Sequence, residues 1–258
     1  MPASPVLRVV EHHAYSFKPF WRYGVVASLV TPALFLAALG LGLGSLVDGD
    51  RSSSLGGVSY LAFVGTGLLA ASAMQVAATE SMFPIMAGIK WIRSWHGLLA
   101  SPISVEALVA GQFVWTALRL FGGCALYLIV LALFGVAERP QALLAVPAAT
   151  LCGMAFATPI AAFSSTQEND QGFVVLLRMA IMPLFLFSGT FFPVSQLPGA
   201  LEAIARFTPL WHGVELTRGL ILGGLSAGAS FVHVVYLSAW VIAGYVISRR
   251  TFRRRMVA

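Results

Sequence analysis

Charged side chains are scarce in this sequence, and their scarcity excludes a soluble globular protein. Asp, Glu, Lys and Arg make up 10% of the 258 residues, while hydrophobic residues make up 58%. Soluble domains carry about 25% charged residues, and a mean hydropathy of +0.84 leaves too little polar surface to cover a soluble core. The composition therefore predicts an all-α membrane protein, formed by residues 1–258 as one domain, because helices satisfy their own backbone hydrogen bonds in lipid.

Lysines, acidic residues and cysteines are too few or too scattered to build a catalytic or metal site. A phosphate-binding loop needs glycine directly before its lysine, but Lys18 and Lys90, the only lysines, each follow an apolar residue. The acids stand singly, no His or Cys spacing suits a metal, and both cysteines lie inside apolar stretches. We expect no catalytic residue, metal or cofactor in this chain. If ATP drives the protein, another chain must bind it.

The net charge of +6 would suit nucleic acid, but the placement of the arginines favours a membrane surface. Five of them directly follow the last apolar stretch: Arg249, Arg250, Arg253, Arg254 and Arg255. Basic residues in this position meet the anionic cytoplasmic leaflet. We expect contact with membrane lipids and none with nucleic acid.

Apolar stretches of about 20 residues predict transmembrane helices, and the chain offers six. They are residues 25–47, 58–79, 106–136, 141–165, 178–192 and 231–248. Residues 1–24 precede them and mix basic with aromatic side chains, which predicts a helix lying in the membrane interface. An ordinary aromatic belt is the alternative for this segment.

Two arginines fall within predicted spans. Arg119 interrupts the third, and Arg178 begins the fifth. A charge inside the bilayer is costly, so Arg119 should face the bundle interior, water or a partner charge. Either arginine could pair with an acid or contact an anionic head group.

Residues 81–103 differ from the spans because they mix apolar and basic side chains. Ile85, Ile89, Ile92 and Leu99 can share one helical face, with Lys90 on another. This spacing predicts an amphipathic helix. Glu80 marks the end of the second span just before this helix, and Pro102 ends the helix. Such a helix either lies on the membrane or forms a docking surface for a cytoplasmic partner.

The stretch 187–223 is apolar but broken. Gly189, Pro193 and Pro209 interrupt it, and proline disfavours helix in the residue before it. This pattern predicts short helical pieces rather than one straight span. Non-helical backbone at membrane depth is tolerated only where protein or water surrounds it.

The basic residues distribute unequally between the two sides of the predicted spans. One side collects 11 of them, including the five terminal arginines, and the other collects 4: Arg51, Arg139, Arg206 and Arg218. The positive-inside rule then places both termini in the cytoplasm. Residues 81–103 fall inside, where an ATPase could reach them, and the broken stretch falls outside.

Several motifs resemble the permease subunits of type-2 ATP-binding cassette exporters, in the branch that includes nodulation lipo-oligosaccharide and antibiotic-resistance exporters. These motifs are LLASPIS, the following ALVAGQFVWTALR and, above all, LFSGTFFPVSQLPGALEAIARFTPLWHGVELTRGLILG. The resemblance covers nearly the whole chain, and the outer stretch is its most specific part.

This resemblance implies a multi-pass protein of the cytoplasmic (inner) membrane that exports amphipathic molecules such as drugs, lipids or glycolipids. It also implies two cytoplasmic ATPase subunits, which bind ATP and Mg, and a second permease, either identical or homologous. In this family, residues 81–103 would contain the coupling helix, and residues 189–218 would form a re-entrant helical hairpin before the last span. A lipid-modifying membrane enzyme and a non-transporting assembly subunit are the alternatives.

The resemblance also suggests roles for particular residues. The candidates for ATPase docking are Lys90, Trp91, Arg93 and His96, for which plain interface anchoring is the alternative. The candidates in the outer hairpin are Gly189, Phe191, Phe192, Pro193, Pro209, Glu215 and Arg218. Phe191 and Phe192 either gate the outer exit or anchor the hairpin in the membrane interface. Glu215 and Arg218 are spaced for a structural ion pair on one helix.

Overall fold

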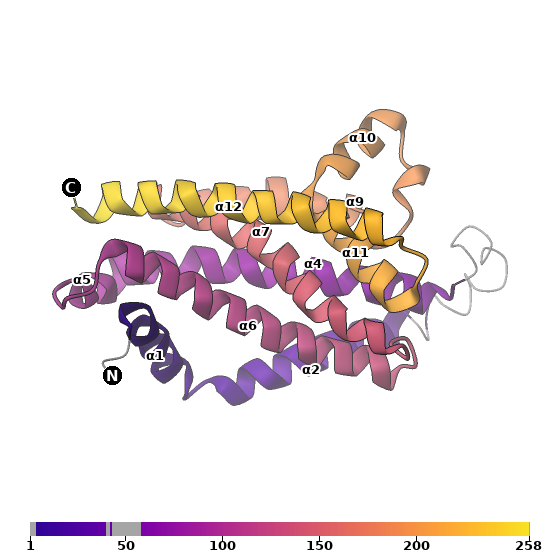
Figure 1. The fold of residues 1–258 in the computed structure, drawn as a ribbon, viewed down its shortest axis with the longest axis horizontal. Coiled ribbons are helices and arrows are strands. Elements are labelled where there is room, and N and C mark those ends of the chain that lie inside the picture. Colours follow the sequence, from indigo (N-terminus) through magenta and orange to yellow (C-terminus); the bar gives the residue numbers. More distant parts are fainter. Residues whose placement is uncertain (1–3, 40–41, 43–57, 258) are drawn as a thin grey trace.

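The structure is a computed structural model that describes residues 4–39, 42 and 58–257, and within them it contains helices and no strand. Four long helices run roughly along the long axis of the molecule (Figure 1). They are α4 (Tyr60–Met86), α6 (Val105–Leu133), α7 (Ala145–Thr166) and α12 (Ala227–Val257). Their length and apolar composition confirm the expected all-α membrane protein.

Shorter elements join the long helices. The α-helices among them are α1 (Pro5–Phe17), α2 (Trp21–Ala37), α5 (Ser94–Leu99), α8 (Gln171–Leu176), α9 (Met182–Phe187), α10 (Gly199–Phe207) and α11 (Pro209–Leu222). The π-helical turns are η3 (Ala87–Trp91) and η5 (Leu177–Ile181), and the 3₁₀ turns are η4 (Pro140–Leu144) and η6 (Val194–Gln196). α1, α5 and the C-terminal end of α12 lie at one end of the bundle, which we call the α5 end, whereas α10 projects near the other, the α10 end (Figure 1).

Local sequence sets where the long helices begin and end. Ser59 Oγ accepts a hydrogen bond from the Ala62 amide at 3.3 Å, and Ser104 Oγ accepts one from the Ala107 amide at 3.2 Å. These N-caps satisfy amides that have no partner within the first turn. Just beyond α6, Gly135 adopts a φ of +72°, the left-handed conformation that commonly terminates helices.

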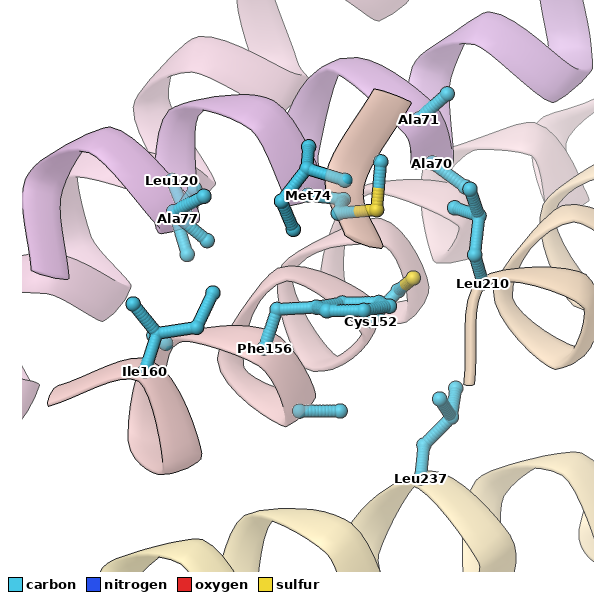
Figure 2. Packing of buried hydrophobic residues seen from close by; sticks show 14 of the residues in the cluster. Ala70, Ala71, Met74, Ala77, Leu120, Cys152, Phe156, Ile160, Leu210 and Leu237 are labelled. Atoms are coloured by element: carbon cyan, nitrogen blue, oxygen red, sulfur yellow. The ribbon is translucent and has the colours of Figure 1, made fainter. Parts of the chain in front are cut away.

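Small side chains allow α4 and α7 to pack closely at the centre of the bundle. Ala70, Met74 and Ala77 of α4 belong to one buried cluster with Cys152 and Phe156 of α7 (Figure 2). Lipid tails are as apolar as these side chains, so association in a membrane depends on close van der Waals packing rather than on the hydrophobic effect. Small residues therefore stabilise this fold.

Two glycines mark the tightest helix contacts. A Cβ added to Gly213 of α11 would lie 2.2 Å from Cys152 Sγ, and one added to Gly244 of α12 would lie 2.4 Å from Thr158 Oγ1. Both α11 and α12 therefore rest directly on α7. Cys152 and the other cysteine, Cys124, are both free and buried, as small core residues.

The described residues contain four helices that are long and apolar enough to cross a membrane, or five if a bent pair counts as one span. The bent pair is α1 and α2, which meet at 78°. The six predicted spans therefore remain a prediction. The prediction for residues 25–47 starts late, since α2 already begins at Trp21, and residues 40–41 and 43–47 lie outside the described part. The predicted fifth span starts too late as well, because the helix runs over Gln171–Phe187 and is shorter than a normal span.

Residues 1–24 do not form one helix. α1 ends at Phe17, and Trp21 starts α2 after a sharp bend, so the second half of the expected interfacial helix belongs to α2. The elbow is formed by residues 18–20, where Pro19 provides no backbone donor for a continuous helix.

The expectation of a single amphipathic helix over residues 81–103 is also wrong. α4 continues past Glu80 and through Pro84 to Met86 and runs into η3, because Glu80 is paired with Arg119 of α6 and need not mark the end of the span. The chain turns only at Arg93, the one described non-glycine residue with a positive φ, at +57°. Ile92 is consequently 74% exposed and does not share the buried face of Ile85.

Replacing Gly88 with alanine should destabilise the end of α4. A Cβ at Gly88 would lie 2.4 Å from Trp95 Nε1, where the buried indole of α5 folds back onto η3. Overpacking of this kind costs about 1–3 kcal/mol, so we expect a lower melting temperature for purified Gly88→Ala protein. Gly97→Ala is the matched control, since its Cβ meets no atom within 4 Å. Equal melting temperatures for the two variants would contradict the assigned packing.

Candidate functional site

The turn formed by residues 90–96 presents the candidate docking side chains at the α5 end. Trp91, Arg93 and His96 are exposed. Lys90 is only about one-third exposed, because its amino group forms an ion pair with Glu168. Three of the four candidates are therefore free to meet a partner, whereas Lys90 is engaged within the chain.

Glu168 joins three separate segments of the chain. It lies in the polar turn after α7 and accepts hydrogen bonds from Lys90 of η3 and from Arg255 of α12, the latter at 2.5 Å. The hydrogen bonds from Lys90 and then Arg255 hold the pKa of the Glu168 carboxyl below its ordinary value. Glu168 was not among the predicted site residues, because its partners lie far away in the sequence and nothing in the TQENDQG turn identifies them.

An aromatic contact fixes α5 against α12 next to these charges. Trp95 and Phe252 are each 1% exposed, and their ring centroids are 5.3 Å apart. The 90–96 turn is thus held by a buried aromatic pair and by an exposed cluster of three charges. Its exposed side chains are carried on a rigid base.

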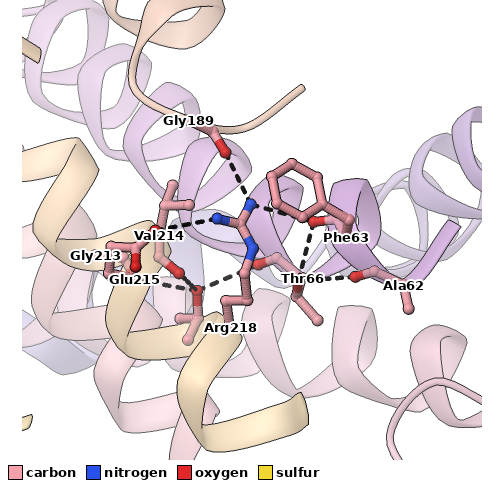
Figure 3. Close-up of polar contacts among 9 residues, drawn as sticks. Ala62, Phe63, Thr66, Gly189, Gly213, Val214, Glu215 and Arg218 are labelled. Atoms are coloured by element: carbon pink, nitrogen blue, oxygen red, sulfur yellow. Dashed lines mark hydrogen bonds and ion pairs between the residues drawn. The ribbon is translucent and has the colours of Figure 1, made fainter. Parts of the chain in front are cut away.

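At the α10 end, Arg218 connects three parts of the chain (Figure 3). Its Nη2 donates to the carbonyl of Gly189 at 2.8 Å and to that of Phe63 in α4 at 3.2 Å. Its Nη1 donates to Glu215 Oε1 at 3.1 Å, and the guanidinium lies 3.8 Å from the centre of the Phe63 ring. The helical spacing indicated the pair with Glu215, but the two carbonyl contacts required the tertiary structure.

Backbone conformation makes the contact with Arg218 possible. Gly189 has a φ of +83°, which side chains rarely allow. The next residue, Thr190, approaches so closely that a Cβ on Gly67 of α4 would lie 3.0 Å from its Cα. The break expected at Gly189 is therefore a tight turn packed on α4.

The remaining hairpin candidates have structural contacts. Phe191 packs edge-on against Phe185, with ring centroids 5.2 Å apart, and Phe192 lies 6.5 Å from Phe187. Both Phe191 and Phe192 are partly buried.

The two prolines stand at helix starts. Pro193 precedes η6, and the buried Pro209 opens α11. Thr208 caps α11 by accepting the Trp211 amide at 3.4 Å. Proline suits the first helical position because the amide that it lacks would have no partner there.

Of the two arginines predicted to lie within spans, one has a partner charge. Arg119 of α6 pairs with Glu80 of α4 at 2.9 Å, and its guanidinium lies 4.1 Å from the centre of the Phe17 ring. Arg178, in η5, is exposed and forms no ion pair with any residue in the described part of the chain.

A pair of histidines, which was not predicted from the sequence, links α11 to α12. Nδ1 of His212 and Nδ1 of His233 are 2.8 Å apart, and the ring of Tyr236 stacks on His212 at 3.9 Å. Within the described residues, no further His, Cys, Asp or Glu completes a group of three that could hold a metal. The pair therefore serves as a polar contact between the two helices.

Comparisons with known proteins add a family to this geometry. The family model described as "ABC-2 type transporter" matches residues 12–222. Similar proteins include Nodulation protein J of Rhizobium leguminosarum bv. viciae, 30% identical over 241 residues that cover 92% of this chain and 91% of that protein. Nodulation protein J of Bradyrhizobium diazoefficiens is 30% identical over 261 residues, covering 96% and 97%. Nodulation protein J of Rhizobium meliloti (strain 1021) is 29% identical over 233 residues, covering 90% and 87%.

Replacing Arg218 should loosen the α10 end. Arg218→Gln leaves the carbonyls of Phe63 and Gly189 without their charged donor, and such hydrogen bonds contribute about 1.5–3 kcal/mol each. We expect a clear drop in the melting temperature of the purified protein. Arg206→Gln is the control, since its pair with Glu202 is largely exposed and such pairs contribute about 0–1 kcal/mol. An equal, small effect of both variants would refute the structural role of Arg218.

The stabilisation that the charge cluster at the α5 end provides should be lost as the pH is lowered. Because the pKa of folded Glu168 is lowered, the stabilisation it provides is fully present above the ordinary carboxyl pKa and is lost as the pH falls through the lowered value. Lys90→Met removes the principal cause, so the pKa of Glu168 should rise. The measurement is a carbon-13 titration of labelled glutamate carboxylates in lipid nanodiscs. Lys18→Met, which removes the only other lysine, should leave this pKa unchanged.

Proposed function

The chain belongs to the ABC-2 type transporter family, and from this membership we propose that it is the permease subunit of an ATP-driven exporter. In this role it moves an amphipathic substrate, such as a drug, lipid or glycolipid, out across the cytoplasmic membrane by alternating access. It has no catalytic site of its own and works with two cytoplasmic ATPase subunits, which bind ATP and Mg. A second permease, identical or homologous, completes the complex.

The observation that carries this proposal is the anchored turn at the α5 end. A subunit that receives mechanical work from an ATPase needs exposed contact residues on a base that transmits force. Trp91, Arg93 and His96 supply the exposed contacts. The buried Trp95–Phe252 pair and the charges around Glu168 supply the base.

The charge distribution supports a cytoplasmic α5 end. Arg8 of α1 and Arg249, Arg250, Arg253 and Arg254 of α12 are all exposed there. Basic residues that flank membrane helices favour the cytoplasmic side. Both termini are accordingly proposed to be cytoplasmic, and the α10 end faces outward.

The form of α10 supports its assignment to an outer re-entrant hairpin. Leu201, Ile204 and Phe207 recur at helical spacing, and their exposures are 48%, 63% and 71%. Arg206 and Glu202 form an ion pair on the same helix. A short helix with one exposed apolar face and one charged face suits the membrane interface.

α4 supplies the connection between the two ends. It receives Arg218 at the Phe63 carbonyl and continues without a break into η3, which ends at the 90–96 turn. ATP-driven movement of this turn would displace α4 and, through Arg218, the Gly189 turn and α11. The driving force is the difference in ATPase binding between the inward-open and outward-open states.

Reversing the charge of the 90–96 turn tests the proposal. The double variant Arg93→Glu, His96→Glu changes exposed side chains only, and it avoids Lys90, whose replacement would also break the contact with Glu168. We expect co-purification with its partner ATP-binding cassette ATPase to fall by about tenfold or more, as is typical for an interface charge reversal. Transport into inverted membrane vesicles should fall with it.

Arg206→Glu at the opposite end provides the matched control and should leave co-purification with the ATPase intact. If the double variant retains both ATPase association and transport, the docking assignment is wrong. If ATPase association depends on the turn but no amphipathic compound is transported, the chain is an assembly subunit rather than a transporter.

A further inference from the structure

A cavity of about 690 Å³ lies between α2, α4 and α6, within a single chain. This volume falls within the range of about 300–1,000 Å³ that is typical of sites for small ligands. The cavity is separate from the docking turn and from the Arg218 network.

One face of each of these helices lines the cavity. On α4 the lining includes Ser72, Gln75, Val76, Thr79 and Glu80, which follow the i, i+3, i+4 spacing of a single stripe. On α6 the stripe passes through Arg119, Gly122, Gly123 and Tyr127. The two glycines create the space, because a Cβ on Gly122 would meet no atom within 4 Å and one on Gly123 would meet only Ser28 Oγ, at 3.9 Å.

The two charged residues of the cavity lie on the side of the elbow between α1 and α2. The Glu80–Arg119 ion pair lines the cavity, and Phe17 covers the Arg119 guanidinium. Farther from this elbow the lining includes the apolar side chains Phe35 of α2, Leu68 of α4 and Phe185 of α9.

A second hollow, of about 440 Å³, adjoins the first on the side of α1. Glu11 and Lys18 line it, and it shares Phe17, Trp21 and Trp115 with the larger cavity. These three aromatic side chains therefore separate an open, charged surface hollow from the cavity beneath the 78° elbow. The arrangement is that of an entrance beside an interior site.

We propose that the cavity binds a single-chain zwitterionic amphiphile that enters past the α1–α2 elbow. Its cationic group would pair with Glu80, its anionic group with Arg119, and its chain would extend along the apolar part of the lining. The ion pair is electrically neutral as a whole, which favours a ligand that also carries both signs. The volume suits one chain and a small head group. Calling this ligand a substrate rests on the proposed function; the binding site itself does not.

The test is photo-crosslinking in phosphatidylcholine nanodiscs with a lysophosphatidylethanolamine that carries a diazirine in its chain. We expect mass spectrometry to locate the label on lining residues of α2, α4 and α6. Gly122→Leu fills the cavity and should reduce labelling about tenfold. Gly228→Leu is the matched control because Gly228 is also a helical glycine with no atom near its Cβ, and it lies outside the lining.

The head-group assignment needs a variant that does not leave a charge unpaired. Glu80→Gln, Arg119→Gln removes both charges together and should weaken labelling by at least about tenfold, because both proposed head-group contacts are lost and each charge-assisted hydrogen bond accounts for about tenfold. Glu202→Gln, Arg206→Gln removes the ion pair of α10 and should have no effect. A monoacylglycerol probe of the same chain length should label the wild type about tenfold less.

The possible results distinguish the proposed ligand site in the cavity from the proposed transport function. Labelling that spreads over the outer faces of α6 and α12 and is unchanged in Gly122→Leu would show ordinary lipid contact and overturn the proposal. Equal labelling by both probes would overturn the zwitterionic assignment. If transport of an amphiphile is retained in Gly122→Leu while labelling is lost, the cavity binds a ligand that is not the substrate. If labelling is as expected but the complex transports nothing, the proposed function fails and the site stands.

Discussion

The continuity of α4 is the constraint on which the rest of the structure depends. The helix and its π-helical extension cover Tyr60–Trp91, which is 32 residues. In the apolar 18-residue stretch of this segment, 78% of the residues are buried. At 1.5 Å per residue this is about 48 Å, enough to cross a bilayer with length to spare. Arg218 holds one end, Glu80 lies in the interior, and the 90–96 turn follows the other end. The contacts at its two ends are thus joined by one continuous helical segment, in which Pro84 and the π-helical η3 are the positions that allow bending.

Close packing is what keeps α4 in place. α7 separates α4 from α12, and contacts such as Gly213 on Cys152 and Gly244 on Thr158 leave no room for a methyl group. In lipid these contacts replace the hydrophobic effect as the source of helix association. In the corresponding apolar stretch of α12 only 17% of the residues are buried, so most of the surface of this last helix is open to its surroundings.

The sequence predicted features that depend on local spacing and failed where tertiary contacts decide. Long apolar stretches located α4, α6, α7 and α12, and a separation of three residues indicated the Glu215–Arg218 pair. The sequence could not indicate that Arg93 would take a left-handed conformation, which is rare for a residue with a side chain. The Glu168 cluster was also beyond prediction, because it joins residues from three segments that only the folded chain brings together.

The cavity between α2, α4 and α6 could not be predicted from the sequence either. Gly122, Gly123, Ser28 and Ser72 each occupy positions where a small residue ordinarily allows close helix packing. Here they face one another across three helices and leave space, which only the arrangement of those helices can show. A sequence pattern of small residues therefore does not distinguish a tight contact from a binding site.

The position of the Glu80–Arg119 pair gives this cavity a physical connection to transport. The pair joins α4 to α6 at a point of α4 between the 90–96 turn and the Arg218 network. Displacing α4 alone would separate two charges in a largely apolar setting, and separating such a pair leaves each charge poorly compensated. A zwitterionic head group would offer both charges new partners and so lower that cost. Ligand binding would then favour the displaced state over the resting state, and this difference between states is what couples a ligand to a conformational change.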